Sequence, residues 1–190
     1  MNRINKVFFS KKKNVLNIYF TAGYPKIDDT LRIARALQAA GTDIIEIGIP
    51  YSDPLADGPT IQYSSQKALD AGMSLKLLMI QLQDLRKYIS IPVILMGYIN
   101  PVLQYGFGKF CQDCKEVGID GVILPDLPVQ EYVETYQRTF EKYGIYNIFL
   151  ITPQTSERRI LRINEVSKGF IYMVSSASIP EPNKMFLKNK

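Results

Sequence analysis

A glutamate inside an apolar run is the first residue of this sequence whose setting suggests chemistry. Glu46 lies in Ile44-Ile45-Glu46-Ile47, a β-branched stretch typical of a buried strand. Strand alternation puts Glu46 on the same face as Ile44 and opposite Ile45 and Ile47. Burial among isoleucines raises the pKa of a carboxyl group toward the range useful for proton transfer near neutrality. The sequence therefore favours an acid–base role for Glu46, with a structural acid hydrogen-bonded to backbone or to a tyrosine as the alternative.

A second carboxylate follows in the loop after this run. Residues 48–60 read GIPYSDPLADGPT, with three prolines and two aspartates four positions apart. A loop stiffened by proline loses less conformational entropy when it closes over a ligand. If Asp57 of this loop lies near Glu46, the two acids form a paired-carboxylate arrangement suited to general acid–base catalysis.

Several other chemistries are excluded by residue type. The sequence has no histidine, which rules out Ser-His-Asp and Cys-His catalysis and any zinc site that needs imidazole. Cys111 and Cys114 form a lone C-x-x-C, too few ligands for zinc. They also fall inside a helical pattern, not at the helix N-terminus that lowers a thiol pKa. We therefore predict no metal site and two reduced, half-buried thiols, as is usual in a cytosolic protein.

Short apolar runs alternate with longer amphipathic segments along the chain. The predicted strands are β-branched or aromatic and lie at 15–20, 44–47, 93–96, 121–124, 146–150 and 170–174. The predicted helices lie at 4–9, 28–40, 61–71, 75–88, 107–117, 129–143 and 156–166. This alternation predicts an α/β fold with a parallel sheet and right-handed crossovers.

Two architectures fit the six predicted β-α units. One is an open doubly wound sheet, although no G-x-G-x-x-G follows the first strand, which weakens its dinucleotide-binding version. The other is a (β/α)8 barrel, which needs eight strands and typically about 250 residues. The chain has 190 residues, so a barrel would be about two β-α units short. In a barrel, Glu46 would lie at the C-terminal end of its strand, where active sites are built.

The charge distribution argues against a nucleic-acid or membrane surface. The formal net charge is +5, but residues 1–13 alone carry five basic side chains and no acid, and residues 181–190 are also basic. The segment between them is mildly acidic, so we interpret the lysine run as a solvated terminus. No apolar stretch approaches the length of a membrane span, and the N-terminus lacks a secretory signal pattern. We therefore predict a cytoplasmic protein that binds neither nucleic acid nor membrane.

Five stretches resemble one known family. The sequence EIGIPYSDPLADGPTIQ at 46–62 resembles the signature of the tryptophan synthase alpha chain over 17 consecutive positions. Supporting stretches are FTAGYP at 20–25, MGYINP at 96–101, GVILPDLP at 121–128 and GFIYMVSSAS at 169–178. The resemblance covers about residues 3–178.

The resemblance implies a TIM (β/α)8-barrel lyase of L-tryptophan biosynthesis. Such a lyase cleaves indole-3-glycerol phosphate to indole and glyceraldehyde 3-phosphate by a retro-aldol reaction. By position, Glu46 would take the proton from the glycerol hydroxyl and deliver one to indole C3, and Asp57 would accept the indole N–H. Tyr172 would orient Glu46. The substrate-binding residues implied for the indole pocket are Tyr19, Tyr98 and Ile123.

The resemblance also implies a partner. The family works with a beta chain as an alpha2-beta2 tetramer, and indole passes between the two chains. No cofactor is implied in this chain, because pyridoxal phosphate belongs to the beta chain. The positions that match the partner-facing segments are Asp53, Pro54, Asn100 and Pro101.

The last residues differ from the family pattern. Residues 179–190 read IPEPNKMFLKNK, with no glycine and no strand pattern, so we divide the chain into a partial barrel at 1–178 and an unrelated-looking basic tail at 179–190. The absent units would supply the loops that usually hold a phosphate. We therefore expect little lyase activity from this chain alone. Two alternatives are a catalytically impaired module that retains at most beta-chain binding and a stable six-stranded open sheet with a new ligand.

Overall fold

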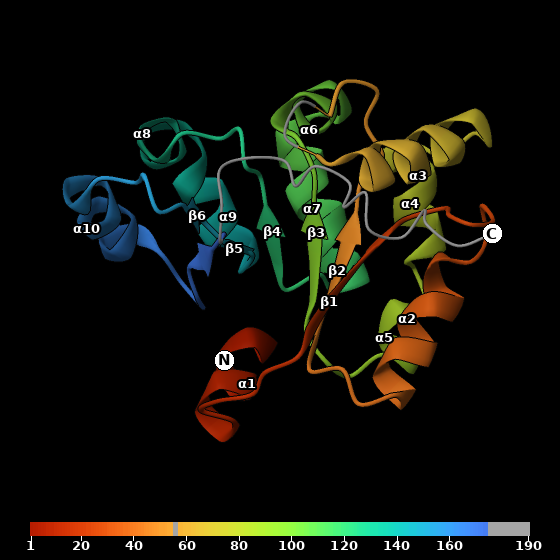
Figure 1. The fold of residues 1–190 in the computed structure, drawn as a ribbon, viewed down its shortest axis with the longest axis horizontal. Helices are drawn as coiled ribbons and strands as arrows, with labels where there is room; N and C mark the ends of the chain where they lie inside the picture. The colour runs from red at the N-terminus through yellow and green to blue at the C-terminus, as the bar shows by residue number, and fades with distance from the viewer. Residues whose placement is uncertain (55–56, 175–190) are drawn as a thin grey trace, which may run out of the picture.

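Parallel strands with helices packed outside them form the centre of the structure. The computed structural model describes residues 1–54 and 57–174. Its strands form a five-stranded parallel sheet in the order β1-β2-β3-β4-β5 and a two-stranded parallel sheet, β6-β7 (Figure 1). The strands are β1 (Asn17–Thr21), β2 (Ile44–Gly48), β3 (Val93–Met96), β4 (Gly121–Ile123), β5 (Tyr146–Asn147), β6 (Leu150–Ile151) and β7 (Tyr172–Met173). The prediction of a parallel α/β sheet is confirmed.

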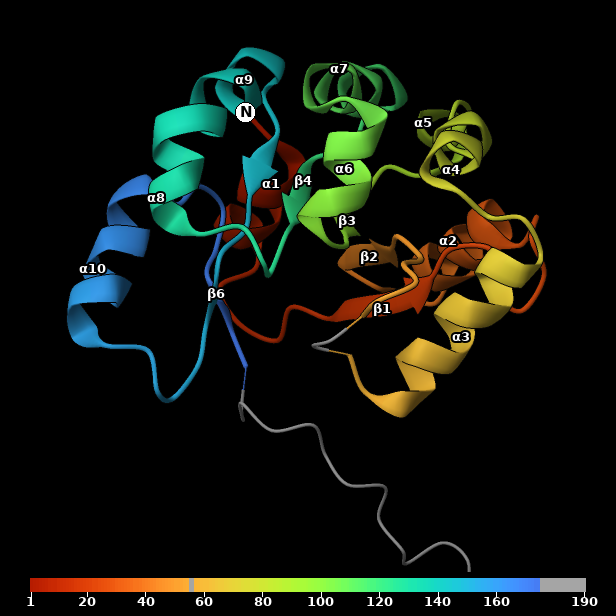
Figure 2. The same cartoon turned by 90° about the horizontal axis from the view of Figure 1, so that it is seen from above.

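Helices connect successive strands and cover the outside of the sheet (Figure 2). They are α1 (Arg3–Ser10), α2 (Thr30–Ala39), α3 (Pro59–Asp70), α4 (Leu75–Gln81), α5 (Leu85–Tyr88), α6 (Ile99–Tyr105), α7 (Phe107–Val117), α8 (Val129–Glu131), a π-helical turn η1 (Tyr132–Tyr136), α9 (Gln137–Tyr143) and α10 (Glu157–Val166). The predicted helix at 107–117 is confirmed to the residue. The predicted helix at 75–88 consists of α4 and α5, and the one at 129–143 consists of α8, η1 and α9.

The helix α6 is absent from the sequence predictions. Pro101 lies in its first turn, where proline is tolerated because the first backbone N–H groups have no partner inside the helix. The carboxylate of Asp126 accepts the Ile99 N–H at 3.0 and 3.1 Å and so satisfies one of these donors. This acceptor is 27 residues away in sequence, so local sequence signals could not reveal it.

Strand alternation separates two cores. Ile44, Ile94, Ile123 and Ile148 lie in a cluster on the inner side of the curved sheet. The residues between them, such as Ile45, point outward and pack against the helices. Glu46 is on the inner side with Ile44, as its predicted alternation requires.

The helix α1 closes the N-terminal end of this inner core. It lies at the end of the strands opposite α3, α6 and α8 (Figure 1). Ile4 of α1 is fully buried in the inner cluster, and Asn2 caps the helix by accepting the Ile4 N–H at 2.9 Å. The Asn2 amide also donates to the Asp120 carbonyl at 2.8 Å, which fixes the start of α1 to the residue that precedes β4.

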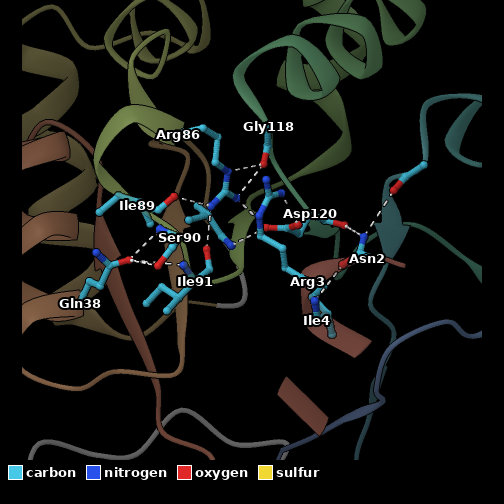
Figure 3. A network of polar contacts seen from close by, with 12 residues as sticks. Asn2, Arg3, Ile4, Gln38, Arg86, Ile89, Ser90, Ile91, Gly118 and Asp120 are labelled. Atoms are coloured by element: carbon cyan, nitrogen blue, oxygen red, sulfur yellow. Dashed lines mark hydrogen bonds and ion pairs between the residues drawn. The ribbon is translucent and has the colours of Figure 1, made fainter. Parts of the chain in front are cut away.

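A buried ion-pair network lies at the same end (Figure 3). The Asp120 side chain is 3% exposed and pairs with Arg86 at 2.6 Å and with Arg3 of α1 at 3.0 Å. It also accepts the Val93 N–H at 2.9 Å. Arg86 donates further to the Gly118 carbonyl, and its burial lowers its pKa to about 10 although Asp120 opposes the shift. One aspartate thus joins α1, α5, β3 and β4.

The predicted strand at 146–150 is wrong in one respect, because it forms two short strands with different partners. The Tyr146 N–H donates to the Asp120 carbonyl at 3.1 Å, so the first part pairs along β4. The Tyr172 N–H donates to the Phe149 carbonyl at 2.8 Å, so the second part pairs with β7. Neighbouring strands of a barrel are staggered, which explains why the two pairings begin at different residues.

The two cysteines are free, and both are fully buried instead of half-buried as predicted. Burial raises the pKa of the Cys111 thiol to about 12 and that of the Cys114 thiol in the same direction. A redox-active thiol needs a lowered pKa, so these two cysteines pack as small apolar side chains of α7.

Replacing Asn147 with leucine is expected to stabilise the protein. Asn147 is 3% exposed, and both polar atoms of its side chain are buried without a partner among residues 1–54 and 57–174. An unsatisfied buried amide is costly, and leucine has nearly the same shape. We expect the Asn147→Leu variant to raise the free energy of unfolding by about 1 kcal/mol in urea denaturation. A decrease would show that the amide is satisfied in solution.

Candidate active site

Glu46 lies in the middle of β2, not at its C-terminal end as predicted, and faces the inside of the sheet. It is 2% exposed. Its Oε1 accepts a hydrogen bond from the Asn17 amide of the neighbouring strand. Burial raises the pKa of the Glu46 carboxyl group above its ordinary value, and the hydrogen bond from Asn17 partly offsets this shift. The sequence-based expectation of a buried carboxyl with a raised pKa is thus met in the structure.

Asp57 lies on the loop between β2 and α3, half-buried beside the strand ends. Its backbone is held on both sides, because its N–H donates to the Pro54 carbonyl at 3.1 Å and its carbonyl accepts the Gln62 amide at 2.8 Å. Burial raises the pKa of the Asp57 carboxyl group, and a hydrogen bond with Tyr98 acts in the opposite direction. A small cavity is lined by Asp57, Tyr19, Tyr98 and Met96, among others.

Tyr19 connects the two carboxyl groups. It is the register partner of Glu46 in the β1–β2 pair, and it also lines the cavity with Asp57. Burial is the main cause of its raised pKa, and the negative charges of Asp57 and Glu46 add to it. Its ring packs on Gly48, where a Cβ atom would lie 2.1 Å from the Tyr19 hydroxyl. The glycine is therefore required for the position of this ring.

Two further predicted residues lie on the inner side of the sheet. Tyr172 of β7 packs on the inner cluster, and burial together with the charge of Glu46 raises its pKa. The hydrogen bond to Glu46 comes from Asn17, however, and not from Tyr172. Ile123 is fully buried in the inner cluster and is in register with Met96, which lines the cavity.

The predicted partner-facing residues gather on the rim beside this cavity. Asp53 is exposed and accepts a hydrogen bond from Ser52 at 2.6 Å. The amide of Asn100, also exposed, donates to the Tyr51 hydroxyl at 3.4 Å, which links α6 to the loop after β2. The Tyr51 ring in turn packs on the Tyr98 ring with centroids 5.1 Å apart. Pro54 and Pro101 are partly exposed beside them.

Within the described ranges no three or more acidic or cysteine side chains come together as metal ligands would. Asp57, Tyr19 and Tyr98 line the cavity at this strand end. The carboxyl group of Glu46 does not line it, but its charge and that of Asp57 both act on Tyr19. This donor set can move protons and hold a flat apolar group against aromatic rings. The fold belongs to the parallel β/α class, and this site holds the kinds of group that an acid–base enzyme carries at the C-terminal ends of its strands.

The chain belongs to the tryptophan synthase alpha chain family, whose model matches residues 6–188. The tryptophan synthase alpha chain of Flavobacterium psychrophilum is 59% identical over 179 residues, which cover 94% of this chain and 70% of that protein. The alpha chain of Phocaeicola vulgatus is 53% identical over 190 residues, which cover 100% of this chain and 74% of that protein.

Solved structures support the same assignment. The crystal structure of tryptophan synthase subunit alpha from Legionella pneumophila has a TM-score of 0.87 at 40% identity, covering 93% of this chain and 68% of that one. The aminoacrylate-bound form of tryptophan synthase from Mycobacterium tuberculosis has a TM-score of 0.86 at 33% identity, covering 93% and 73%. The described strands are therefore part of a TIM barrel.

Membership settles several predictions. The family is a lyase of tryptophan biosynthesis that cleaves indole-3-glycerol phosphate, and it acts with a beta chain. The alpha chain carries no cofactor, and pyridoxal phosphate belongs to the beta chain. The alternative of an impaired chain that only binds the beta chain is not favoured.

No helix in the described residues is long and apolar enough to cross a membrane. The domain boundary at 178 lies outside the described residues and stays a prediction.

Sequence reasoning missed one residue of the site, Asn17. Its side chain contacts Glu46, yet the predicted strand at 15–20 gave it no role. The available signal was its period-two spacing from Tyr19, which puts both residues on the inner side of the sheet. What the sequence alone did not give is the register of β1 against β2, which brings Asn17 next to Glu46.

Proposed function

We propose that this chain cleaves indole-3-glycerol phosphate with Glu46 as the proton-transfer group and Asp57 as the group that binds the indole N–H. The observation that carries the proposal is that Tyr19 is next to both groups: it is the register partner of Glu46, which is 2% exposed in the middle of β2, and it lines the cavity together with Asp57. The same proposal includes a cytoplasmic location. The two free cysteines support it, because the cytosol keeps thiols reduced.

The proposed chemistry balances protons within the site. Protonated Glu46 delivers its proton to indole C3, while the Asp57 carboxylate accepts the indole N–H and stabilises the positive charge on the ring. The Glu46 carboxylate then takes the proton of the glycerol hydroxyl, the carbon–carbon bond breaks, and its electron pair returns to the ring. The products are indole and an aldehyde, and Glu46 ends in the protonated form with which it began.

The raised pKa of Glu46 suits this cycle. A group that must both give and accept a proton works best when its pKa lies near the working pH. Burial moves the pKa of Glu46 in that direction from its ordinary acidic value. Tyr19, Tyr98 and Ile123 are proposed to hold the indole ring, and Tyr172 is proposed to help orient Glu46 through their shared position on the inner side.

The rim residues Asp53, Pro54, Asn100 and Pro101 are proposed to face the beta chain. Their support is the contact between Asn100 and Tyr51, which joins the two rim segments next to the cavity. A partner bound to this rim would cover the proposed exit of indole.

The proposal is tested by measuring indole release from indole-3-glycerol phosphate by the purified protein, with and without a tryptophan synthase beta chain. We expect indole to be released and the beta chain to increase the rate. Absence of indole under both conditions, with the protein folded by circular dichroism, would contradict the proposal.

Replacing Gly48 with alanine is expected to impair the site while the fold remains. The new Cβ would lie 2.1 Å from the Tyr19 hydroxyl, so the ring must move out of its position over the strand. Small displacements of positioning groups are costly, and we expect kcat/KM for indole release to fall about tenfold or more. Gly108→Ala in α7 is the matched control, because nothing lies within 4 Å of its added Cβ. Equal activity of the two variants would contradict the role of Tyr19.

A further inference from the structure

Asn17 is a polar residue at an apolar position. It begins β1 on the inner side of the sheet, and its register partner is Ile44 of the inner cluster. An amide costs free energy at such a position unless it is hydrogen-bonded. Its Nδ2 donates to Glu46 Oε1, the carboxyl group two residues beyond Ile44 on the same face of β2.

This contact reaches Glu46 from the N-terminal side of the site. Tyr19, the register partner of Glu46, lies further along β1 toward the cavity, whereas Asn17 is half-buried and lies two residues earlier, toward the N-terminal end of the strands. The hydrogen bond that Asn17 gives to Oε1 from this N-terminal side fixes the rotation of the Glu46 carboxyl group. The second oxygen, Oε2, takes no part in this contact.

We propose that Asn17 is a positioning residue for the lyase reaction, which holds the carboxyl group of Glu46 from inside the barrel so that Oε2 meets the substrate. This inference rests on the proposed role of Glu46. It adds a residue that acts through Glu46 and does not itself touch the substrate.

The side-chain oxygen of Asn17, Oδ1, lets the same residue hold Glu46 when Glu46 is protonated. Its Oδ1 is buried and accepts no hydrogen bond from the described residues. An amide carries a donor and an acceptor, so rotation of its terminal group by half a turn presents Oδ1 to a carboxylic acid O–H. Asn17 can therefore hold Glu46 in both of the protonation states through which the proposed reaction passes.

The test replaces Asn17 with leucine, which has nearly the same shape but no donor, and with aspartate, which has the same shape and a like charge. Two quantities are measured: the pKa of the Glu46 carboxyl group by carbon-13 NMR, with Glu46→Gln to assign its signal, and the apparent pKa of the alkaline limb of kcat/KM for indole release, where activity falls as Glu46 loses its proton. Loss of a hydrogen bond that favours the charged form raises the pKa. We expect both quantities to move up by about one pH unit in Asn17→Leu and further in Asn17→Asp.

Asn147→Leu is the matched control, because it makes the same substitution at a buried strand asparagine on the opposite, helix-facing side of the sheet. We expect it to leave both quantities unchanged. If either Asn17 variant is folded and the Glu46 pKa and the alkaline limb stay at their wild-type values, the inference is overturned. The proposed function fails by a different result, namely unchanged indole release in Glu46→Gln, so the two failures are distinguishable.

Discussion

The Glu46→Gln variant is expected to lose indole release by about 1000-fold in kcat, the size of effect that removal of a general acid–base group produces. Glutamine keeps the shape of the side chain, and its carbonyl can still accept the amide hydrogen bond that Asn17 gives to Glu46. It can neither give nor take the proton of the reaction. The loss therefore isolates proton transfer from packing.

The same variant is expected to be at least as stable as the wild type at neutral pH. The folded-state pKa of Glu46 is raised, so the folded form binds the proton more tightly than the unfolded chain does. The resulting stabilisation is fully present below the unfolded-state pKa and is lost as the pH rises through the folded-state pKa. Above the folded-state pKa, the protein contains a buried negative charge that lowers the free energy of unfolding. Glutamine is uncharged, so the variant does not carry this penalty.

Glu116→Gln, at an exposed position of α7, is the control for the activity measurement. Indole release and thermal unfolding are measured for both variants between about pH 4 and pH 8, the range that spans the ordinary and raised values of a glutamate pKa. A Glu46→Gln variant that keeps more than a tenth of the wild-type kcat would remove Glu46 from the mechanism. A large loss of stability would instead show that Glu46 is mainly structural.

Replacing Asp120 with alanine is expected to lower the free energy of unfolding by about 3–5 kcal/mol, the cost of breaking a buried ion pair on one side. Arg86 would keep its charge in a site from which water is largely excluded, and the Val93 N–H would lose its acceptor. Arg3 would lose the contact that helps hold α1 against the end of the barrel (Figure 3).

The matched control is Asp84→Ala, which removes an exposed pair with Lys87 at 2.9 Å. Exposed pairs contribute roughly 0–1 kcal/mol, so this variant should unfold close to the wild type. Both are measured by urea denaturation at the same pH. A similar small effect for the two aspartates would mean that the network of Asp120 is hydrated in solution.

Local sequence signals predicted the strands and the setting of Glu46 well. The alternation of Ile44, Ile45, Glu46 and Ile47 was enough to predict that Glu46 is buried on the same face as Ile44, because a strand has only two faces and isoleucines flank Glu46 on both. The family resemblance then pointed to Asp57, Tyr19 and Tyr98, which line one cavity in the structure. Tyr172, which it also named, packs on the inner cluster instead.

The remaining features depend on contacts between distant residues. The Asp120 network joins residues 34 and 117 positions away, and the acceptor at the start of α6 is 27 positions away. The role of Asn17 depends on the register of β1 against β2, which a single-sequence pattern does not specify. The division of residues 146–151 into β5 and β6 likewise follows from barrel stagger, not from composition.

The most direct test of proton transfer by Glu46 compares two pKa values of the same protein. One is the pKa of the Glu46 carboxyl group in the free enzyme, measured by carbon-13 NMR, and the other is the apparent pKa of the alkaline limb of kcat/KM for indole release, because the proposed cycle starts from protonated Glu46. We expect the two values to coincide, above the ordinary value of a glutamate. An alkaline limb whose apparent pKa lies a full unit or more from the titration of Glu46 would contradict the account.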